Sequence, residues 1–189
     1  TRWLSDWSSD VCSSDLLYTE FARRLADNGF RVLLLDANDF SVNQVPACQG
    51  KIRTLLKDYL PVSAGKVAII GYSLGGAVAL SCAAGMPESV AVVVAYYPAT
   101  KLISDTKTCI ERFRVPIIVL QGEDDRYFDC CTVEKVRDMQ QTARAKGMDF
   151  ELIVYPYAGH GFNLGSMKDP QLDYDSWRKT TDALKKHLH

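Results

Sequence analysis

The feature that most constrains the fold of this chain is a serine flanked by glycines between an apolar run and a helix-like run. The segment 71–75 (GYSLG) follows the apolar residues KVAII and precedes small residues over 77–86. A G-x-S-x-G sequence in this context is typical of a sharp strand-to-helix turn that holds the serine hydroxyl above a sheet. The glycines fit there because the backbone must fold tightly around Ser73. The turn therefore indicates an α/β fold.

Strand-like and helix-like runs alternate along the chain from residue 17. Apolar runs predict strands over 30–35, 66–70, 90–96, 116–120 and 150–155, and helical patterns cover 17–28, 49–60, 77–86, 133–146 and 173–188. The strands are near-continuous runs of Val, Ile and Leu, which suit parallel strands covered on both faces. We expect an open, mostly parallel sheet flanked by helices, with chemistry at the carboxyl ends of its strands.

The first sixteen residues break this pattern. Residues 1–16 (TRWLSDWSSDVCSSDL) are rich in Ser and Asp and show neither a strand nor a helix period, nor the regions of a signal peptide. The stretch from Asp6 to Leu16 resembles the translation of a common sequencing-library adapter. We therefore expect 1–16 to be an artefact and disordered, the alternative being a natural Ser/Asp-rich tail. Residues 17–189 are expected to form one truncated α/β domain.

Charge and hydropathy exclude several classes of partner. The 189 residues carry 22 Lys and Arg against 23 Asp and Glu, a net charge of −1. This balance gives no electrostatic basis for binding nucleic acid or an anionic membrane. No apolar run approaches the ~18 residues of a membrane span. We expect neither a nucleic-acid nor a membrane partner, and the oligomeric state stays open.

The six cysteines show no disulfide framework. They are Cys12, Cys48, Cys82, Cys109, Cys130 and Cys131. Cys82 lies in an apolar helical stretch, and Cys130 and Cys131 are adjacent, which is unlike a small secreted scaffold. We therefore expect reduced thiols and a cytoplasmic protein.

A nucleophilic serine needs a base, and His160 is the best candidate. The chain has three histidines, and His187 and His189 end a charged helix where both are expected to be solvated. His160 instead lies in the motif YAGHGF, directly after the strand predicted over 150–155. Glycines on both sides suit an imidazole held on a loop at a strand end.

The base in turn needs an orienting carboxylate, which should lie between the serine and the histidine in the chain. Asp125 meets this condition, since it follows the strand predicted over 116–120. Asp124 competes with it directly, and spacing does not separate the two. Asp36, Asp39 and Asp105 are weaker candidates, because solvated acids at strand ends are common.

One further group belongs to the predicted site, and four aromatic residues are candidates to line a pocket beside it. The Leu74 N–H, at the start of the predicted helix, can point at a developing oxyanion. Four aromatic residues follow strand ends and are expected either to line a pocket or to pack in the core. They are Tyr96, Tyr97, Tyr127 and Phe128.

These motifs resemble those of the dienelactone hydrolase family of α/β-hydrolases. FARRLADNGFRVLLLD, GYSLGGAVAL, AYYP, PIIVLQGEDDRYF and YAGHGF carry the resemblance over about 17–188. The family's G-x-x-D pattern falls on Gly122 to Asp125 and favours Asp125, and its histidine motif falls on His160. Many members have cysteine where this chain has Ser73. The resemblance therefore implies general hydrolysis of small-molecule esters or lactones, and not a specificity restricted to lactones. It implies no metal and no cofactor.

In this fold, the chain before Leu17 should supply further strands. One lies between the strands predicted over 30–35 and 66–70, and the loop after it supplies a second oxyanion N–H. We expect this strand to be missing, which leaves two unpaired strand edges. Loss of one oxyanion donor would lower the kcat of the hydrolase ~10²–10³-fold. The natural protein is thus expected to be a hydrolase, and this chain a truncated copy of it.

Other functions stay open at this point. The same turn serves thioesterases, peptidases and acyltransferases, which substrate profiling would separate. A non-catalytic α/β domain that binds a nucleotide or a partner is a second alternative, although the chain has neither G-x-G-x-x-G nor a P-loop lysine. A pseudoenzyme fragment is a third.

Overall fold

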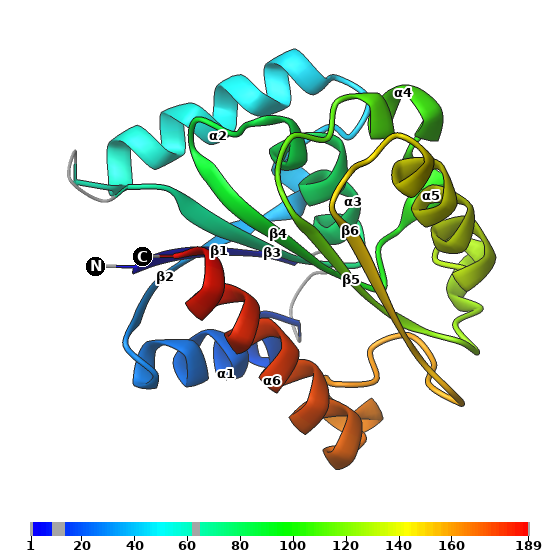
Figure 1. The fold of residues 1–189 in the computed structure, drawn as a ribbon. Helices are drawn as coiled ribbons and strands as arrows, with labels where there is room; N and C mark the ends of the chain where they lie inside the picture. Colours follow the sequence, from blue (N-terminus) through cyan, green and yellow to red (C-terminus); the bar gives the residue numbers. More distant parts are fainter. Residues whose placement is uncertain (1, 9–13, 62–64, 189) are drawn as a thin grey trace.

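The computed structural model describes residues 2–8, 14–61 and 65–188, which form a parallel sheet between two helical layers (Figure 1). The sheet order is β2-β1-β3-β4-β5-β6, and every neighbouring pair is parallel. The strands are β1 (Arg2–Ser8), β2 (Phe30–Asp36), β3 (Val67–Tyr72), β4 (Val90–Tyr96), β5 (Ile117–Gly122) and β6 (Phe150–Tyr155). The helices are α1 (Ser14–Asp27), α2 (Val45–Tyr59), α3 (Leu74–Ser81), α4 (Thr106–Glu111), α5 (Val133–Ala145) and α6 (Pro170–His187). The predicted α/β class is confirmed.

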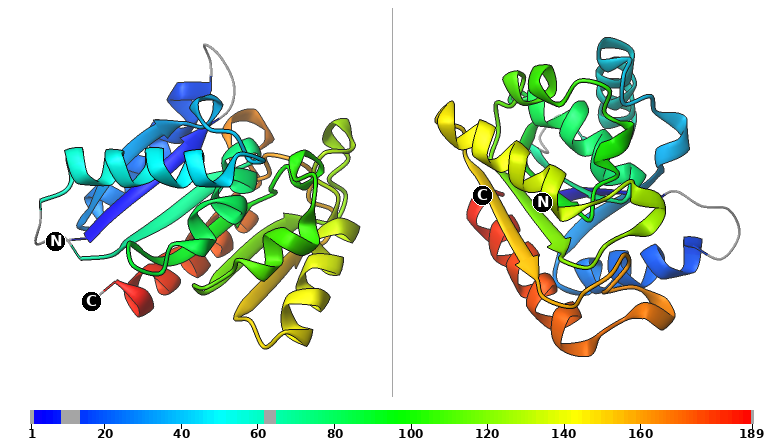
Figure 2. Two further views of the ribbon diagram at one scale, coloured as in Figure 1. Left: turned by 90° about the horizontal axis from the view of Figure 1, so that it is seen from above. Right: turned by 90° about the vertical axis from the view of Figure 1, so that its right-hand side faces the viewer.

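The two faces of the sheet bury separate apolar clusters. Val67 and Ile69 of β3 pack on the side of α2 to α5, whereas Ala68 and Ile70 pack on the side of α1 and α6. This alternation follows from the two-residue period of a strand, and burial on both faces explains the unbroken apolar run. The views in Figure 2 show α1 and α6 side by side on their face. Arg24 of α1 joins them through an ion pair of 3.0 Å with Asp173.

The structure corrects the prediction of a disordered segment with a missing strand. Residues 2–8 form β1, which pairs with β2 from Arg2 to Ser8 and with β3 from Leu4 to Trp7. The edges predicted to be unpaired are therefore paired. A ladder needs only backbone N–H and C=O groups, so a Ser/Asp-rich stretch can fill a place between two strands. Residues 1 and 9–13 of the first sixteen lie outside the described residues, and an adapter origin of Asp6 to Leu16 stays a prediction.

Some element boundaries differ from their predicted positions. Helix α3 begins at Leu74, directly after Ser73, rather than at residue 77. Helix α2 begins at Val45, where Pro46 occupies the first turn, a position that needs no backbone donor. The short helix α4 was not predicted; Asp105 caps it by accepting from the Thr108 N–H at 3.0 Å.

The cysteines correct a second prediction. Disulfides join Cys48 to Cys82 and Cys130 to Cys131, whereas Cys109 is a buried free thiol. The expectation of reduced thiols is wrong for these four residues, because the fold brings Cys48 of α2 against Cys82 at the end of α3. Cys12 lies outside the described residues. Within the described ranges, no helix combines the length and apolarity needed to span a membrane.

Candidate active site

Ser73 lies at the turn between β3 and α3, where the sheet order changes direction. The chain runs from β1 outward to β2 and then returns to β3 on the other side of β1. Sites in open α/β sheets gather at such a switch point, beyond the carboxyl ends of the strands. Ser73 has φ 49° and ψ −112°, values that a residue with a side chain rarely adopts. Its N–H donates to the Tyr96 carbonyl at 3.0 Å, and its own carbonyl accepts from the Ala99 N–H at 2.9 Å.

Gly71 makes this turn possible. A Cβ at Gly71 would overlap the backbone carbonyl of Gly75 and the N–H of Gly76. The strand end and the first turn of α3 can therefore approach only because residue 71 has no side chain.

We expect Gly71→Ala to destabilise the protein. The added methyl group must displace backbone, and overpacking of this kind costs about 1–3 kcal/mol. The matched control is Gly50→Ala within α2, where a Cβ would meet nothing within 4 Å. Because alanine is the better helix former, this control should gain about 0.5–1 kcal/mol. Urea unfolding of both variants measures the two changes, and equal stability of Gly71→Ala and the parent would contradict the packing argument.

His160 links the two other predicted residues. Its Nε2 lies 3.1 Å from the Ser73 Oγ, and its Nδ1 lies 2.8 Å from an Asp125 carboxylate oxygen. The loop after β6 carries the histidine, and it packs so closely that a Cβ at Gly122 would overlap the Ala158 carbonyl. Residues 35 and 87 apart in the chain thus meet in one line of hydrogen bonds.

Asp125 and Asp124 occupy different environments. Asp125 is fully buried, and its carboxylate accepts from the Tyr127 N–H at 3.1 Å and from the Gln121 amide at 3.4 Å, besides its contact with His160. Asp124 is exposed and contributes its backbone N–H to the Ala158 carbonyl. The structure brings Asp125, and not Asp124, to the imidazole.

The weaker acid candidates have other partners. Asp36 accepts from the Asn38 N–H, Asp39 pairs with Lys51 at 3.3 Å, and Asp105 caps α4. Each of these contacts is local or lies on the surface. None of these acids contacts His160, so we assign them no role as the acid that orients it.

Gln121 was not singled out from the sequence. It is fully buried, and its amide nitrogen donates to the Cys131 carbonyl at 2.7 Å and lies 3.4 Å from Asp125. The Gln121 amide thereby links the Asp125 carboxylate to the backbone at Cys131, which follows the η4 turn (Tyr127–Asp129). One polar residue inside the apolar strand IIVLQG is the signal that sequence inspection could have used.

Two tyrosine rings hold the imidazole. The Tyr127 ring stacks on His160 with centroids 4.5 Å apart and planes 7° apart, and Tyr97 meets the same ring edge-on at 4.6 Å. Tyr97 is itself held by a 2.9 Å hydrogen bond to Asn163. Tyr96 is a core residue, and burial raises its pKa, whereas Phe128 is exposed. Of the four aromatic candidates, Tyr97 and Tyr127 therefore belong to the site.

The Leu74 N–H, predicted as an oxyanion donor, lies in the first turn of α3 directly after Ser73. Leu74 opens α3, and the first N–H groups of a helix have no partner within it. They are therefore available to a negative oxygen formed above Ser73. The loop predicted to supply a second donor follows β1, and residues 9–13 lie outside the described residues.

Three metal-ligand types meet near His160, but they do not suit a metal. Ligand atoms of Asp125, Cys131 and His160 lie within 4.8 Å of one another. The Cys131 sulfur is bound to Cys130 and offers no thiolate. Both ring nitrogens of His160 already contact Ser73 and Asp125.

Comparison with known sequences finds a matching protein family and several individual relatives. Residues 38–188 match the model of the dienelactone hydrolase family. A Yersinia pestis protein provisionally named a carboxymethylenebutenolidase is 30% identical over 132 residues, which is 65% of this chain and 47% of that protein. Protein usf of Aquifex pyrophilus is 24% identical over 159 residues, or 82% of this chain and 66% of that protein. The chain thus spans about half the length of the Yersinia relative.

Solved structures share the fold. The Pyrococcus furiosus esterase superposes with a TM-score of 0.77 at 17% identity, covering 100% of this chain and 84% of that chain. A dienelactone hydrolase-like promiscuous phosphotriesterase from metagenomic libraries gives 0.75 at 20% identity, with coverages of 100% and 87%. At these identities the likeness concerns the fold alone.

Proposed function

Because the chain belongs to the dienelactone hydrolase family, we propose that the protein is a serine hydrolase that cleaves carboxylic esters or lactones through a covalent acyl-enzyme. The observation that carries this proposal is the line of hydrogen bonds from Asp125 through His160 to Ser73. Acyl transfer needs a nucleophile, a base and an orienting acid in that order.

In the proposed mechanism, Ser73 is the nucleophile and His160 the base. The Ser73 Oγ attacks the ester carbonyl carbon while the His160 Nε2 takes its proton. The carbonyl oxygen becomes an oxyanion, to which the Leu74 N–H donates. Collapse of this intermediate expels the alcohol, which receives the proton from His160. Water, activated by the same imidazole, then releases the acid and restores Ser73.

Asp125 is proposed to hold His160 in the productive tautomer. With Nδ1 donating to the Asp125 carboxylate, Nε2 is left as an acceptor facing Ser73. The buried carboxylate also balances the imidazolium that forms during the reaction. The remaining donors to Asp125, from Tyr127 and Gln121, keep it oriented.

Hydrolysis of short p-nitrophenyl esters tests the activity, and labelling by a fluorophosphonate tests the nucleophile. We expect saturable release of p-nitrophenol from the acetate and butyrate esters, and one label per chain. Thioester and peptide anilide substrates run beside them separate esterase from thioesterase and peptidase. Folded protein that neither hydrolyses the esters nor takes the label would contradict the proposal.

The prediction of a cytoplasmic location rests on reduced thiols. The disulfides Cys48–Cys82 and Cys130–Cys131 remove that support, because such bonds persist in oxidising compartments.

A further inference from the structure

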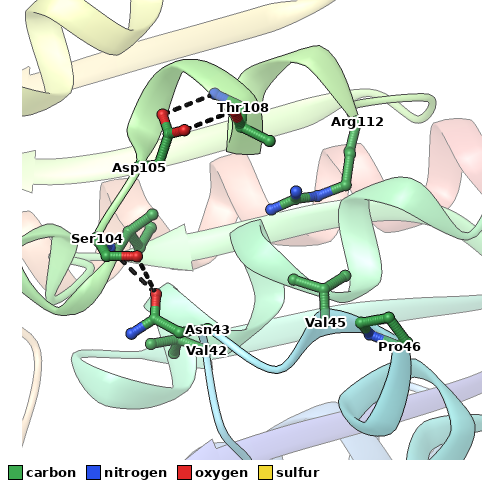
Figure 3. A pocket seen from close by; sticks show the side chains of 9 residues that line it. Val42, Asn43, Val45, Pro46, Ser104, Asp105, Thr108 and Arg112 are labelled. Carbon is green, nitrogen blue, oxygen red and sulfur yellow. Dashed lines mark hydrogen bonds between the residues drawn. The ribbon is translucent and has the colours of Figure 1, made fainter.

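A cavity lies apart from the proposed catalytic residues. It measures about 200 Å³ and opens between the chain entering α2 and the segment that carries α4 (Figure 3). Val42, Val45 and Ile103 line it with buried apolar side chains. The volume is below the ~300–1,000 Å³ of sites for drug-sized ligands, so the cavity suits a small molecule.

Most polar side chains at this cavity already have partners. The Asn43 side-chain oxygen accepts from the Ser104 N–H at 3.1 Å and from its hydroxyl at 2.9 Å, and the Asn43 amide donates to the Leu102 carbonyl. The Asp105 carboxylate accepts from the Thr108 N–H at 3.0 Å and from its hydroxyl at 2.6 Å. These groups therefore need no ligand.

Arg112 differs from them. Figure 3 shows its guanidinium extending between the Asp105–Thr108 pair and the Ser104–Asn43 pair. The Arg112 Nε is buried without a hydrogen-bond partner. Within the described part of the chain, no carboxylate forms an ion pair with this guanidinium. Arg112 as a whole is half-buried, and a buried N–H donor without a partner costs free energy that a ligand able to accept from it would recover.

The neighbouring thiol does not balance this charge. The Cys109 side chain contacts Arg112, but burial raises the pKa of Cys109 to about 11, so the thiol is neutral at physiological pH. Asp105 interacts with Arg112 electrostatically, but its carboxylate is hydrogen-bonded to Thr108 and, among the described residues, forms no ion pair with the guanidinium. The Arg112 guanidinium therefore keeps an unpaired N–H donor at the cavity.

We propose that this cavity binds a small monocarboxylate with a short apolar tail. The carboxylate would form a charge-assisted pair with the Arg112 guanidinium, whose planar fork matches it, and the tail would pack on Val42, Val45 and Ile103. The site uses none of Ser73, Asp125 and His160, so the inference does not depend on the proposed activity.

Asp105 selects among anions. Hydrogen bonds from the Thr108 hydroxyl and N–H lower the pKa of Asp105, which keeps its carboxylate ionised beside the cavity. A dianion such as phosphate would meet more repulsion there than a monoanion does. Replacement of Asp105 by asparagine is therefore expected to favour phosphate.

Titration of the ¹⁵N-labelled protein with isobutyrate, followed by amide NMR, tests the site. We expect isobutyrate to cause saturable changes in the amide chemical shifts of Ser104, Asp105 and Thr108. The neutral isostere isobutyramide should cause no such changes, and phosphate should bind more weakly than isobutyrate. Arg112→Gln should weaken isobutyrate binding about tenfold or more, since it removes a charged hydrogen-bonding partner.

The matched control is Arg114→Gln, which removes a nearby exposed arginine that is hydrogen-bonded to the Glu111 and Phe113 carbonyls. It should leave isobutyrate binding unchanged. Binding of isobutyrate by Arg112→Gln within about twofold of the parent, equal binding of isobutyramide, or shifts confined to the surroundings of His160 would each overturn the proposal. If Arg112→Gln does not fold, Arg112→Lys and the isobutyramide comparison decide it.

Discussion

Ser73→Ala is expected to lower kcat for p-nitrophenyl butyrate by about 10⁶-fold and to abolish fluorophosphonate labelling. The substitution removes the Oγ that faces His160 Nε2 at 3.1 Å, so no acyl-enzyme can form. The loss should appear in kcat, because the substrate-binding surface keeps its shape. Steady-state kinetics at saturating ester and intact-mass analysis of the labelled protein measure both effects.

The fold should survive this change, since alanine keeps the Cβ and the backbone contacts of residue 73. Thermal unfolding is therefore expected at the same Tm. Ser81→Ala, at the other end of α3, is the matched control, because Ser81 is buried but lies outside the proposed catalytic line. It should retain activity. Persistent turnover and labelling in folded Ser73→Ala would rule out this nucleophile.

Asp125→Asn is expected to lower kcat by about 10⁴-fold. An amide nitrogen facing His160 Nδ1 would favour the tautomer that carries its proton on Nε2, and this tautomer cannot accept from Ser73. The buried amide also no longer balances an imidazolium. Since the change alters chemistry more than binding, the KM for the ester should move far less than kcat.

Asp124→Asn provides the neighbouring control. Its side chain is exposed, and its hydrogen bond to the Ala158 carbonyl comes from the backbone, which the substitution keeps. We expect kcat within about twofold of the parent, as for surface changes that touch no partner. The reverse ranking of the two variants would reassign the acid to Asp124.

Local patterns predicted most of the scaffold. Apolar runs located five of the six strands, and the glycine-flanked serine located the turn at Ser73. His160 was predicted for a similarly local reason, because its glycine-rich motif directly follows β6. These predictions succeeded because strand, helix and turn preferences act between residues close in the chain.

Contacts between distant segments were not predictable in the same way. Strand β1 has no apolar run, and its place depends on the backbone edges of β2 and β3. Tyr127 stacks on His160 only because the loops after β5 and β6 lie side by side. The disulfide between Cys48 and Cys82 was not predictable either, because α2 and the end of α3 meet only in the folded chain.

The amino-acid sequence alone thus determined an α/β chain with a serine turn and a loop histidine. Residue spacing did not separate Asp125 from Asp124, and only the family pattern favoured Asp125. The tertiary structure placed Asp125 against His160 and left Arg112 at a cavity with no ion pair among the described residues. The reason is that adjacent residues share one local pattern but not one environment. Burial, hydrogen-bond partners and unpaired charge arise only when segments far apart in the chain meet.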